Sequence, residues 1–243
     1  MSQPKLFSII DRAVFDYRLI EEGDNILVGA SGGKDSTALI EYFACRQKQK
    51  RENFSLTAFH VATEIAPPLS DELIETFKNW GIQLKIMNVS VLERLKTGKT
   101  MNCWWCSTQR RTELNNFAIK NGFNKIALGH HLDDILETLL MNALNKGQLS
   151  TMPPRLSYKK YPITIIRPLC MAPVTIIKEH AQNQGYSSTT CTCSYQDNSG
   201  RKEARKRLEA LTQGNNSEKQ RLFNALRNVR REYLTYPYNE RDL

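Results

Sequence analysis

A glycine-rich turn lies between an apolar segment and a helix-like segment near the N-terminus, and it constrains the fold more than any other feature of the chain. Residues 25–30 (NILVGA) predict a buried strand, and residues 36–43 (STALIEYF) predict a helix. Between them, Gly32 and Gly33 allow a tight turn in which backbone N–H groups can approach an anion. The N-terminus of the helix adds unsatisfied N–H groups, so the segment predicts a phosphate site.

The spacing of this turn, SGGKDS at residues 31–36, excludes two common phosphate loops. A Walker loop needs two glycines separated by four residues before Lys and Ser or Thr, and the dinucleotide fingerprint needs G-x-G-x-x-G. The turn instead resembles the pyrophosphatase loop (PP-loop) of the ATP-pyrophosphatase superfamily. That resemblance implies that ATP is bound, is cleaved between its α- and β-phosphates, and adenylates a substrate.

The residues in and before the turn are therefore candidates for nucleotide binding. Lys34 is expected to stabilise charge on the departing pyrophosphate. The resemblance implies that Asp35 binds Mg²⁺ bridging phosphate oxygens, with capping of the following helix as the alternative. Both residues are also catalytic candidates. The nucleotide-binding candidates in this segment are Ala30, Ser31, Gly32, Gly33, Lys34, Asp35 and Ser36.

Predicted strands and helices alternate along the chain, which predicts an α/β fold. We expect a Rossmann-like, doubly wound, mainly parallel sheet that binds ligands outside the carboxyl ends of its strands. Residues 1–170 are expected to form a PP-loop ATP-binding domain and residues 171–243 a helical C-terminal extension, together one structural unit. Further strands are predicted at 54–59, 84–89, 125–128 and 163–166, and helices at 5–20, 69–80, 107–120, 132–144, 174–185, 200–211 and 218–234.

Basic residues exceed acidic ones in this chain of 243 residues, which has a net charge of +9. Many of the surplus positive charges lie at 201–207 and 227–231. They favour nucleic acid as a partner over a membrane, with a solvated basic helix as the alternative. No segment has the ~18 consecutive apolar residues of a membrane-spanning helix. We therefore expect a cytosolic protein, whose six cysteines are poor candidates for structural disulfides.

Two groups of cysteines have spacings typical of metal ligands. Cys103 and Cys106 form a C-x-x-C motif just before a predicted helix, whose N-terminus lowers the pKa of a thiol. Alone, this motif fits half of a zinc site, a redox pair, part of an iron–sulfur site, or packed core cysteines. Cys191 and Cys193 offer further ligands late in the chain, so the two groups together predict an iron–sulfur cluster or a zinc site.

A second conspicuous motif, GHHLDD at residues 129–134, lies at a predicted strand-to-helix junction. Such a junction is expected to form another wall of the nucleotide cleft. Gly129, His130 and Asp134 are the nucleotide-binding candidates in this motif, and a structural hydrogen bond is the alternative for His130. His60 follows the second strand and is a candidate for a place near the adenine, with core or surface as the alternative.

The order of the motifs resembles the TtcA family of tRNA 2-thiocytidine synthetases from about residue 10 to about residue 235. The resemblance implies an enzyme that adenylates the C2 oxygen of a cytidine in the tRNA anticodon loop. A cysteine desulfurase would supply the sulfur that replaces this oxygen, and three cysteines would hold an oxygen-sensitive [4Fe–4S] cluster. The segments that carry the resemblance are the PP-loop, the C-x-x-C followed by Ser107, the GHHLDD motif, Met152-Pro153-Pro154, Arg167-Pro168-Leu169 and the late cysteines.

Three cysteine ligands leave one iron of the cluster open to hold a sulfide nucleophile. By this resemblance Cys103 and Cys106 are the first pair of ligands and candidates for catalysis, and Cys193 is the third. The family has C-x-x-C at the second site, whereas Cys191 and Cys193 are separated by one residue. Cys191 is therefore an alternative ligand, a fourth ligand or a spare, and zinc is the alternative metal.

The residues and the resemblance also lead to expectations about partners. Trp104 and Trp105 would stack on a flipped base or else cover the core. A homodimer is expected because family members are often dimers. Two alternative functions remain: another PP-loop tRNA-modifying enzyme, with thiouridine or lysidine chemistry, or a zinc-stabilised RNA- or nucleotide-binding protein without catalysis. Candidate contacts to RNA phosphates, with surface salt bridges as the alternative, are Arg110, Arg111, Arg155 and Arg167.

Overall fold

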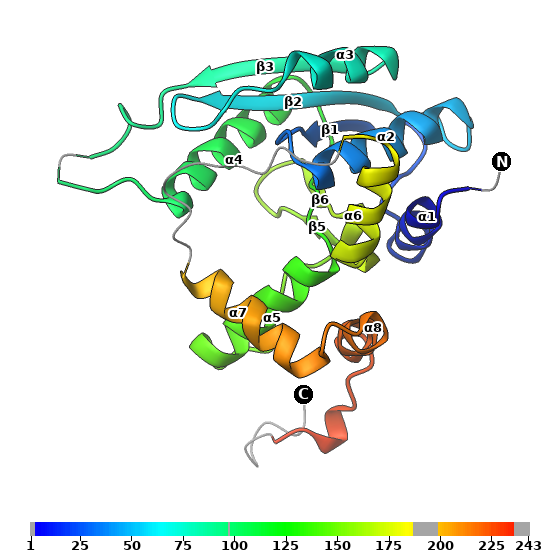
Figure 1. Cartoon of the computed structure of the whole chain (residues 1–243), viewed down its shortest axis with the longest axis vertical. Helices are drawn as coiled ribbons and strands as arrows, with labels where there is room; N and C mark the ends of the chain where they lie inside the picture. The colour runs from blue at the N-terminus through cyan, green and yellow to red at the C-terminus, as the bar shows by residue number, and fades with distance from the viewer. Residues whose placement is uncertain (1–2, 97, 187–198, 236–243) are drawn as a thin grey trace.

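A computed structural model describes residues 3–96, 98–186 and 199–235, and a twisted sheet lies at its centre (Figure 1). Within these ranges the sheet has six strands in the order β3-β2-β1-β4-β6-β5. Neighbouring strands are parallel except for β5, which runs antiparallel to β6. The strands are β1 Asn25–Gly29, β2 Ser55–Thr63, β3 Gln83–Val89, β4 Lys125–Ala127, β5 Arg155–Ser157 and β6 Thr164–Ile166.

Helices cover both faces of the sheet, and the last two α-helices of the described chain pack on another helix. α4 covers one face, and α1, α2 and α6 lie over the other. α7 and α8 pack against α5 beyond the sheet (Figure 1). The α-helices are α1 Lys5–Tyr17, α2 Lys34–Lys48, α3 Asp71–Asn79, α4 Cys103–Lys120, α5 Leu132–Lys146, α6 Val174–Asn183, α7 Ser199–Thr212 and α8 Asn216–Ala225; the 3₁₀ helices are η1 Pro168–Met171 and η2 Arg231–Tyr233.

Apolar residues on both sides of the central strand explain why β1 is buried on both faces. Ile26 and Val28 belong to the apolar core that includes α1 and α2, whereas Leu27 belongs to the core under α4. Alternate residues of a strand point to opposite faces, so a continuous apolar segment is what a strand between two helical layers requires. The expected mainly parallel, doubly wound α/β fold is confirmed.

Three details of the predicted elements are wrong. α4 begins at Cys103 rather than at 107, because Asn102 caps it through a hydrogen bond accepted from the backbone of Trp105. The short antiparallel strand β5 was not predicted, since its three residues are too few to show alternation. The helix predicted over 218–234 ends at Ala225 and is followed by the short 3₁₀ helix η2.

The division of the chain at residue 170 stays a prediction. In the structure α6 packs against α2, and α7 and α8 pack against α5, so helices after residue 170 contact helices before it. In the part of the chain that the structure describes, no helix is long and apolar enough to cross a membrane.

A buried ion pair links β4 to the segment before β1. Lys125 Nζ lies 2.7 Å from Asp24 and 2.8 Å from Glu21. Lys125 and Asp24 are only 3% and 4% exposed, so each charge is stabilised by the other rather than by water.

We expect Lys125→Met to lower the free energy of unfolding by about 3 kcal/mol, because it leaves the buried Asp24 carboxylate without its cation. Urea denaturation followed by circular dichroism measures this change. Lys85→Met is the matched control, since Lys85 is exposed on β3. Equal unfolding midpoints for the two variants would contradict the role given to the buried pair.

Candidate active site

Two strand-to-helix turns meet at the carboxyl edge of the sheet, between the neighbouring strands β1 and β4. Ile26, Leu27 and Val28 are in register with residues 125–127, so the turns after both strands begin at the same level. The strand order reverses at this point, which is where open α/β sheets bind ligands. A Cβ atom added to Gly129 would lie 3.2 Å from the backbone of Asp35 and of Ser36. The second turn therefore packs directly against the first.

Hydrogen bonds within the turn at residues 31–36 fix its shape. Gly32 has a φ of +84°, a conformation that side chains disfavour. Ser31 and Ser36 share a hydrogen bond of 3.0 Å between their hydroxyls, and the Ser31 backbone N–H donates to Ser36 Oγ. The Gly33 backbone N–H donates to Ser31 Oγ, although weakly at 3.3 Å. These contacts fix the backbone that would receive a phosphate.

The first turn of α2 carries the two charged candidates of this loop. Gly33 occupies the N-cap position without a side-chain hydrogen bond, so the alternative that Asp35 caps the helix is wrong. Lys34 Nζ donates to both carboxylate oxygens of Asp35, at 3.0 and 2.9 Å. About a quarter of each side chain is exposed, 23% for Lys34 and 28% for Asp35. A cation and a carboxylate therefore stand together at the rim of the phosphate turn.

His60 lies within β2 rather than after it, because β2 continues to Thr63, and the ring contacts the backbone just before the turn. Its Nδ1 lies 2.7 Å from the carbonyl of Ala30, and burial lowers the pKa of the ring. Its Nε2 is buried and has no hydrogen-bond partner among the described residues. The predicted place near the adenine stays a prediction for His60. The contact with Ala30 shows that His60 also positions the backbone just before the turn.

The second turn, residues 129–134, begins α5 with a reciprocal cap. The backbone N–H of His131 donates to Asp134 Oδ2 at 3.1 Å, and the backbone N–H of Asp134 donates to His131 Nδ1 at 3.3 Å. Asp133 is buried and accepts hydrogen bonds from Lys219 and from the backbone of Val174. Within this motif, His131 therefore caps α5, and Asp133 connects α5 to α6 and α8.

His130 lies at the same turn with a buried Nδ1 that has no hydrogen-bond partner in the described ranges. The pKa of His130 is lowered to about 4, mainly by burial; Asp134 raises it, and the positive charges of Arg167 and Arg201 add to the lowering. The ring is therefore neutral near pH 7. It can exchange a hydrogen bond with a ligand but carries no positive charge of its own.

The two cysteines of the C-x-x-C motif lie in the first turn of α4. Residues three apart on a helix face the same side, so Cys103 and Cys106 are neighbours. Cys106 is buried and Cys103 is half-buried. Trp105 donates from Nε1 to the carbonyl of Val91, just after β3, which holds this turn at the carboxyl end of the sheet. The neighbouring Trp104 is 66% exposed, which disfavours a place over the core.

The complete ligand set stays a prediction because Cys191 and Cys193 lie outside the described residues. Within the described residues, no group of three His, Cys, Asp or Glu side chains is placed to hold a metal ion.

Comparison with known proteins identifies the family. The chain matches the PP-loop domain family over residues 7–234. It is 34% identical over 237 residues to the tRNA-cytidine(32) 2-sulfurtransferase of Alkalilimnicola ehrlichii, covering 96% of this chain and 75% of that protein. It is 32% identical to tRNA-cytidine(32) 2-sulfurtransferase 1 of Francisella philomiragia, covering 96% and 93%. The chain belongs to the PP-loop tRNA-cytidine 2-sulfurtransferase (TtcA) family.

A solved structure supports the same fold for this TtcA-family chain. The U34-tRNA thiolase NcsA from Methanococcus maripaludis, solved with its [4Fe–4S] cluster, has a TM-score of 0.73. The match covers 98% of this chain and 84% of that one, at 20% identity. At this identity the likeness establishes the arrangement of strands and helices but not the substrate.

The four arginines predicted to contact RNA differ in their surroundings in this TtcA-family protein. Arg111 is exposed on α4, and Arg110 is half-buried and close enough to His60 to lower the pKa of that ring. Arg155 donates to the carbonyl of Arg18 and pairs with Glu21. Arg167 is 7% exposed and donates to the carbonyl of Pro153. RNA contact stays a prediction for all four, and the surroundings of Arg155 and Arg167 favour structural roles.

One residue near the site was not a candidate from the sequence. Arg201, at the start of α7, has its Nη1 3.7 Å from Asp134 Oδ1. In the sequence it was one of several residues in a basic segment, and nothing in that segment distinguishes it from its neighbours. Its position depends on how α7 packs on α5.

We expect acid to destabilise the folded protein partly through His130. Its pKa is about 4 in the folded protein against 6.5 ordinarily, so the unfolded chain binds the proton first as the pH falls. Its contribution is fully present above pH 6.5 and declines toward pH 4. Urea denaturation of wild type and His130→Gln should show wild type losing about 2 kcal/mol more between about pH 7 and about pH 4.5. Parallel pH profiles would contradict the lowered pKa.

Proposed function

We propose that this protein is an ATP-dependent tRNA sulfurtransferase that replaces the C2 oxygen of an anticodon-loop cytidine with sulfur. The observation that carries the proposal is the packing of the PP-loop against the 129–134 turn at the switch point of the sheet, in a chain of this family. Relatives named for cytidine 32 support the substrate. The surplus of basic residues, with a net charge of +9, is consistent with binding RNA.

The residues of the PP-loop fit the nucleotide that the family binds. The positive φ of Gly32 gives the loop a conformation that side chains disfavour, and the missing side chain of Gly129 lets the second turn pack against the start of α2. In the proposal, the backbone N–H groups of the first turn of α2, residues 34–36, hold phosphate oxygens, and Lys34 stabilises charge on the departing pyrophosphate. Asp35 holds Mg²⁺, which neutralises phosphate charge when bound.

The chemistry has two steps with balanced bonds. First, the cytidine C2 oxygen bonds to the α-phosphorus of ATP, and pyrophosphate leaves. Then the sulfur bonds to C2, and AMP leaves with the original oxygen. Neutral His130 and the carboxylate of Asp134 line the second turn, where they can position the nucleotide without adding positive charge.

The cysteines fit the role of cluster ligands. Cys103 and Cys106 are adjacent on the first turn of α4, and the positive end of this helix favours thiolates. We propose Cys193 as the third ligand, Cys191 as an alternative to it, and a cysteine desulfurase as the sulfur donor. When bound, a [4Fe–4S] cluster with three protein ligands supplies an open iron that can carry sulfide. The proposal includes action in the cytoplasm, where tRNA is available and thiols stay reduced, and a homodimer.

Asp35→Asn is expected to lower thiolation of tRNA by about 100-fold while leaving the iron content unchanged, because it removes a ligand of Mg²⁺ but no cysteine. Mass spectrometry of tRNA nucleosides measures 2-thiocytidine and separates it from 2-thiouridine. Asp71→Asn, at the exposed first turn of α3, is the matched control. Retained thiolation in Asp35→Asn would exclude Asp35 from metal binding.

Protein purified without oxygen is expected to contain about four irons and four sulfides per chain. Cys103→Ala, Cys106→Ala and Cys193→Ala should each lose the iron and the brown colour. Cys45→Ala should keep both, because Cys45 lies on α2 and packs against the apolar core. Iron and sulfide analysis together with the visible spectrum gives the result. A colourless wild type containing one zinc would overturn the cluster and leave the PP-loop assignment standing.

A further inference from the structure

Two ion pairs in register join α7 to the beginning of α5. Arg205 Nε lies 2.8 Å from Glu137 Oε1, and Arg201 Nη1 lies 3.7 Å from Asp134 Oδ1. Arg201 and Arg205 are four residues apart on α7, and their partners are three residues apart on α5, so each pair occupies one turn of each helix. Arg201 is on the turn that meets the N-terminus of α5.

The two arginines are held in different ways. The Arg205 side chain is 67% exposed, but its partner Glu137 is 1% exposed and the two are within hydrogen-bond distance, so this pair anchors α7. Ala204 and Leu208, buried at a spacing of four residues, add an apolar contact on the same helix. The Arg201 contact is longer than a hydrogen bond, and 39% of its side chain is exposed. The position of α7 therefore does not require Arg201.

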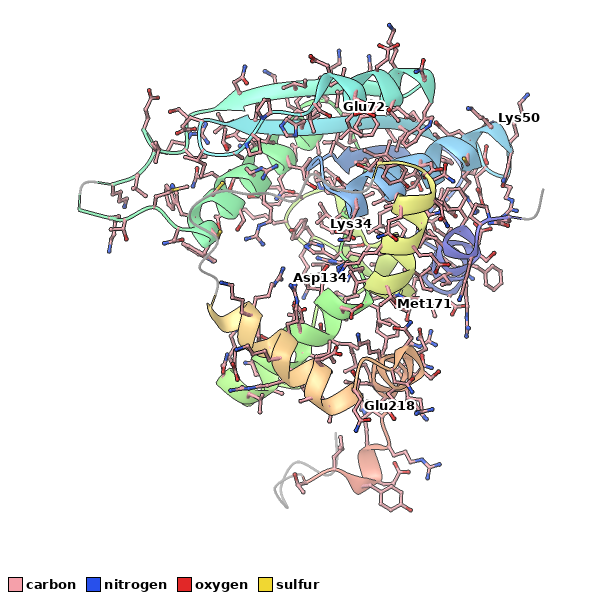
Figure 2. All side chains as sticks on the ribbon, viewed as in Figure 1. Lys34, Lys50, Glu72, Asp134, Met171 and Glu218 are labelled. Atoms are coloured by element: carbon pink, nitrogen blue, oxygen red, sulfur yellow. The ribbon has the colours of Figure 1, made fainter. Side chains whose placement is uncertain are left out.

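The contact with Asp134 places the guanidinium of Arg201 beside the 129–134 turn of the candidate active site. Asp134 uses Oδ2 to accept from the backbone of His131, and its Oδ1 faces Arg201. Asp134 belongs to the turn that packs on the PP-loop, and Figure 2 shows Asp134 and Lys34 in the same central region of the molecule. The positive charge of Arg201 also reaches His130, whose pKa it lowers.

We propose that Arg201 binds a phosphate group of a substrate at this site. A guanidinium can donate two parallel hydrogen bonds to phosphate oxygens, and its charge stays fixed at any working pH. The weak contact with Asp134 holds the guanidinium beside the 129–134 turn, where its partly exposed side chain can reach a ligand. The phosphate belongs either to ATP or to the RNA backbone. This inference rests on the proposed function, and it adds a residue of α7 to the site.

Four variants of the anaerobically purified protein test the proposal. Arg201→Gln removes the charge, Arg201→Lys keeps the charge without the fork of donors, and Arg205→Gln breaks the structural anchor. Arg207→Gln is the matched control, because Arg207 lies on the same helix in an exposed pair with Glu203. For each variant we would measure the Kd for a non-hydrolysable ATP analogue, the Kd for unmodified tRNA at several salt concentrations, and the melting temperature.

An ATP site predicts that Arg201→Gln weakens analogue binding about 10-fold, with tRNA affinity and melting temperature unchanged. An RNA site predicts instead weaker tRNA binding and a salt slope smaller by about 1, with analogue binding unchanged. In either case Arg201→Lys restores part of the loss and Arg207→Gln behaves as wild type.

The inference is overturned if Arg201→Gln keeps both affinities, or if it only lowers the melting temperature as Arg205→Gln does. A wild type that binds the ATP analogue but never thiolates tRNA would overturn the proposed function. The role of Arg201 in binding phosphate would still be decided by the two affinities.

Discussion

The close packing of two strand-to-helix turns is the constraint on which the site depends. β1 and β4 are parallel neighbours in register, so the turns that follow them emerge side by side. Gly129 has no side chain to separate them, and a Cβ there would lie 3.2 Å from the backbone of Asp35 and of Ser36. Any larger residue would push α5 away from the PP-loop. The geometry of the phosphate turn and the position of α5 are therefore linked.

The acidic beginning of α5 organises the C-terminal helices around this contact. Asp133 pairs with Lys219 of α8 in a buried contact of 2.8 Å, and the buried Glu137 pairs with Arg205 of α7. Burying such charges is costly unless each finds its partner, so these pairs specify where the helices dock. Some of the basic C-terminal residues therefore fix the helices, and others remain exposed.

The cysteine pair lies at the same edge of the sheet because of the direction in which α4 runs. α4 leads from the carboxyl end of β3 to the amino end of β4, so its first turn, with Cys103 and Cys106, lies at the carboxyl edge. The bond from Trp105 to the carbonyl of Val91 fixes that turn. The backbone of the PP-loop, a neutral histidine and two thiols are thus presented at one edge of the sheet, which is the arrangement that the proposed adenylation and sulfur transfer would require.

The sequence by itself determined the parallel α/β fold, the PP-loop, the GHHLDD turn and the cysteine pair, because each is a local pattern of a few adjacent residues. It did not place the start of α4 at Cys103, because the cap that Asn102 forms is a hydrogen bond that is visible only in the structure. Nor could it separate Arg201 from the other basic residues near it, or show that Arg167 is buried. Those outcomes depend on which helix packs on which, and burial and ion pairing arise only when distant segments meet.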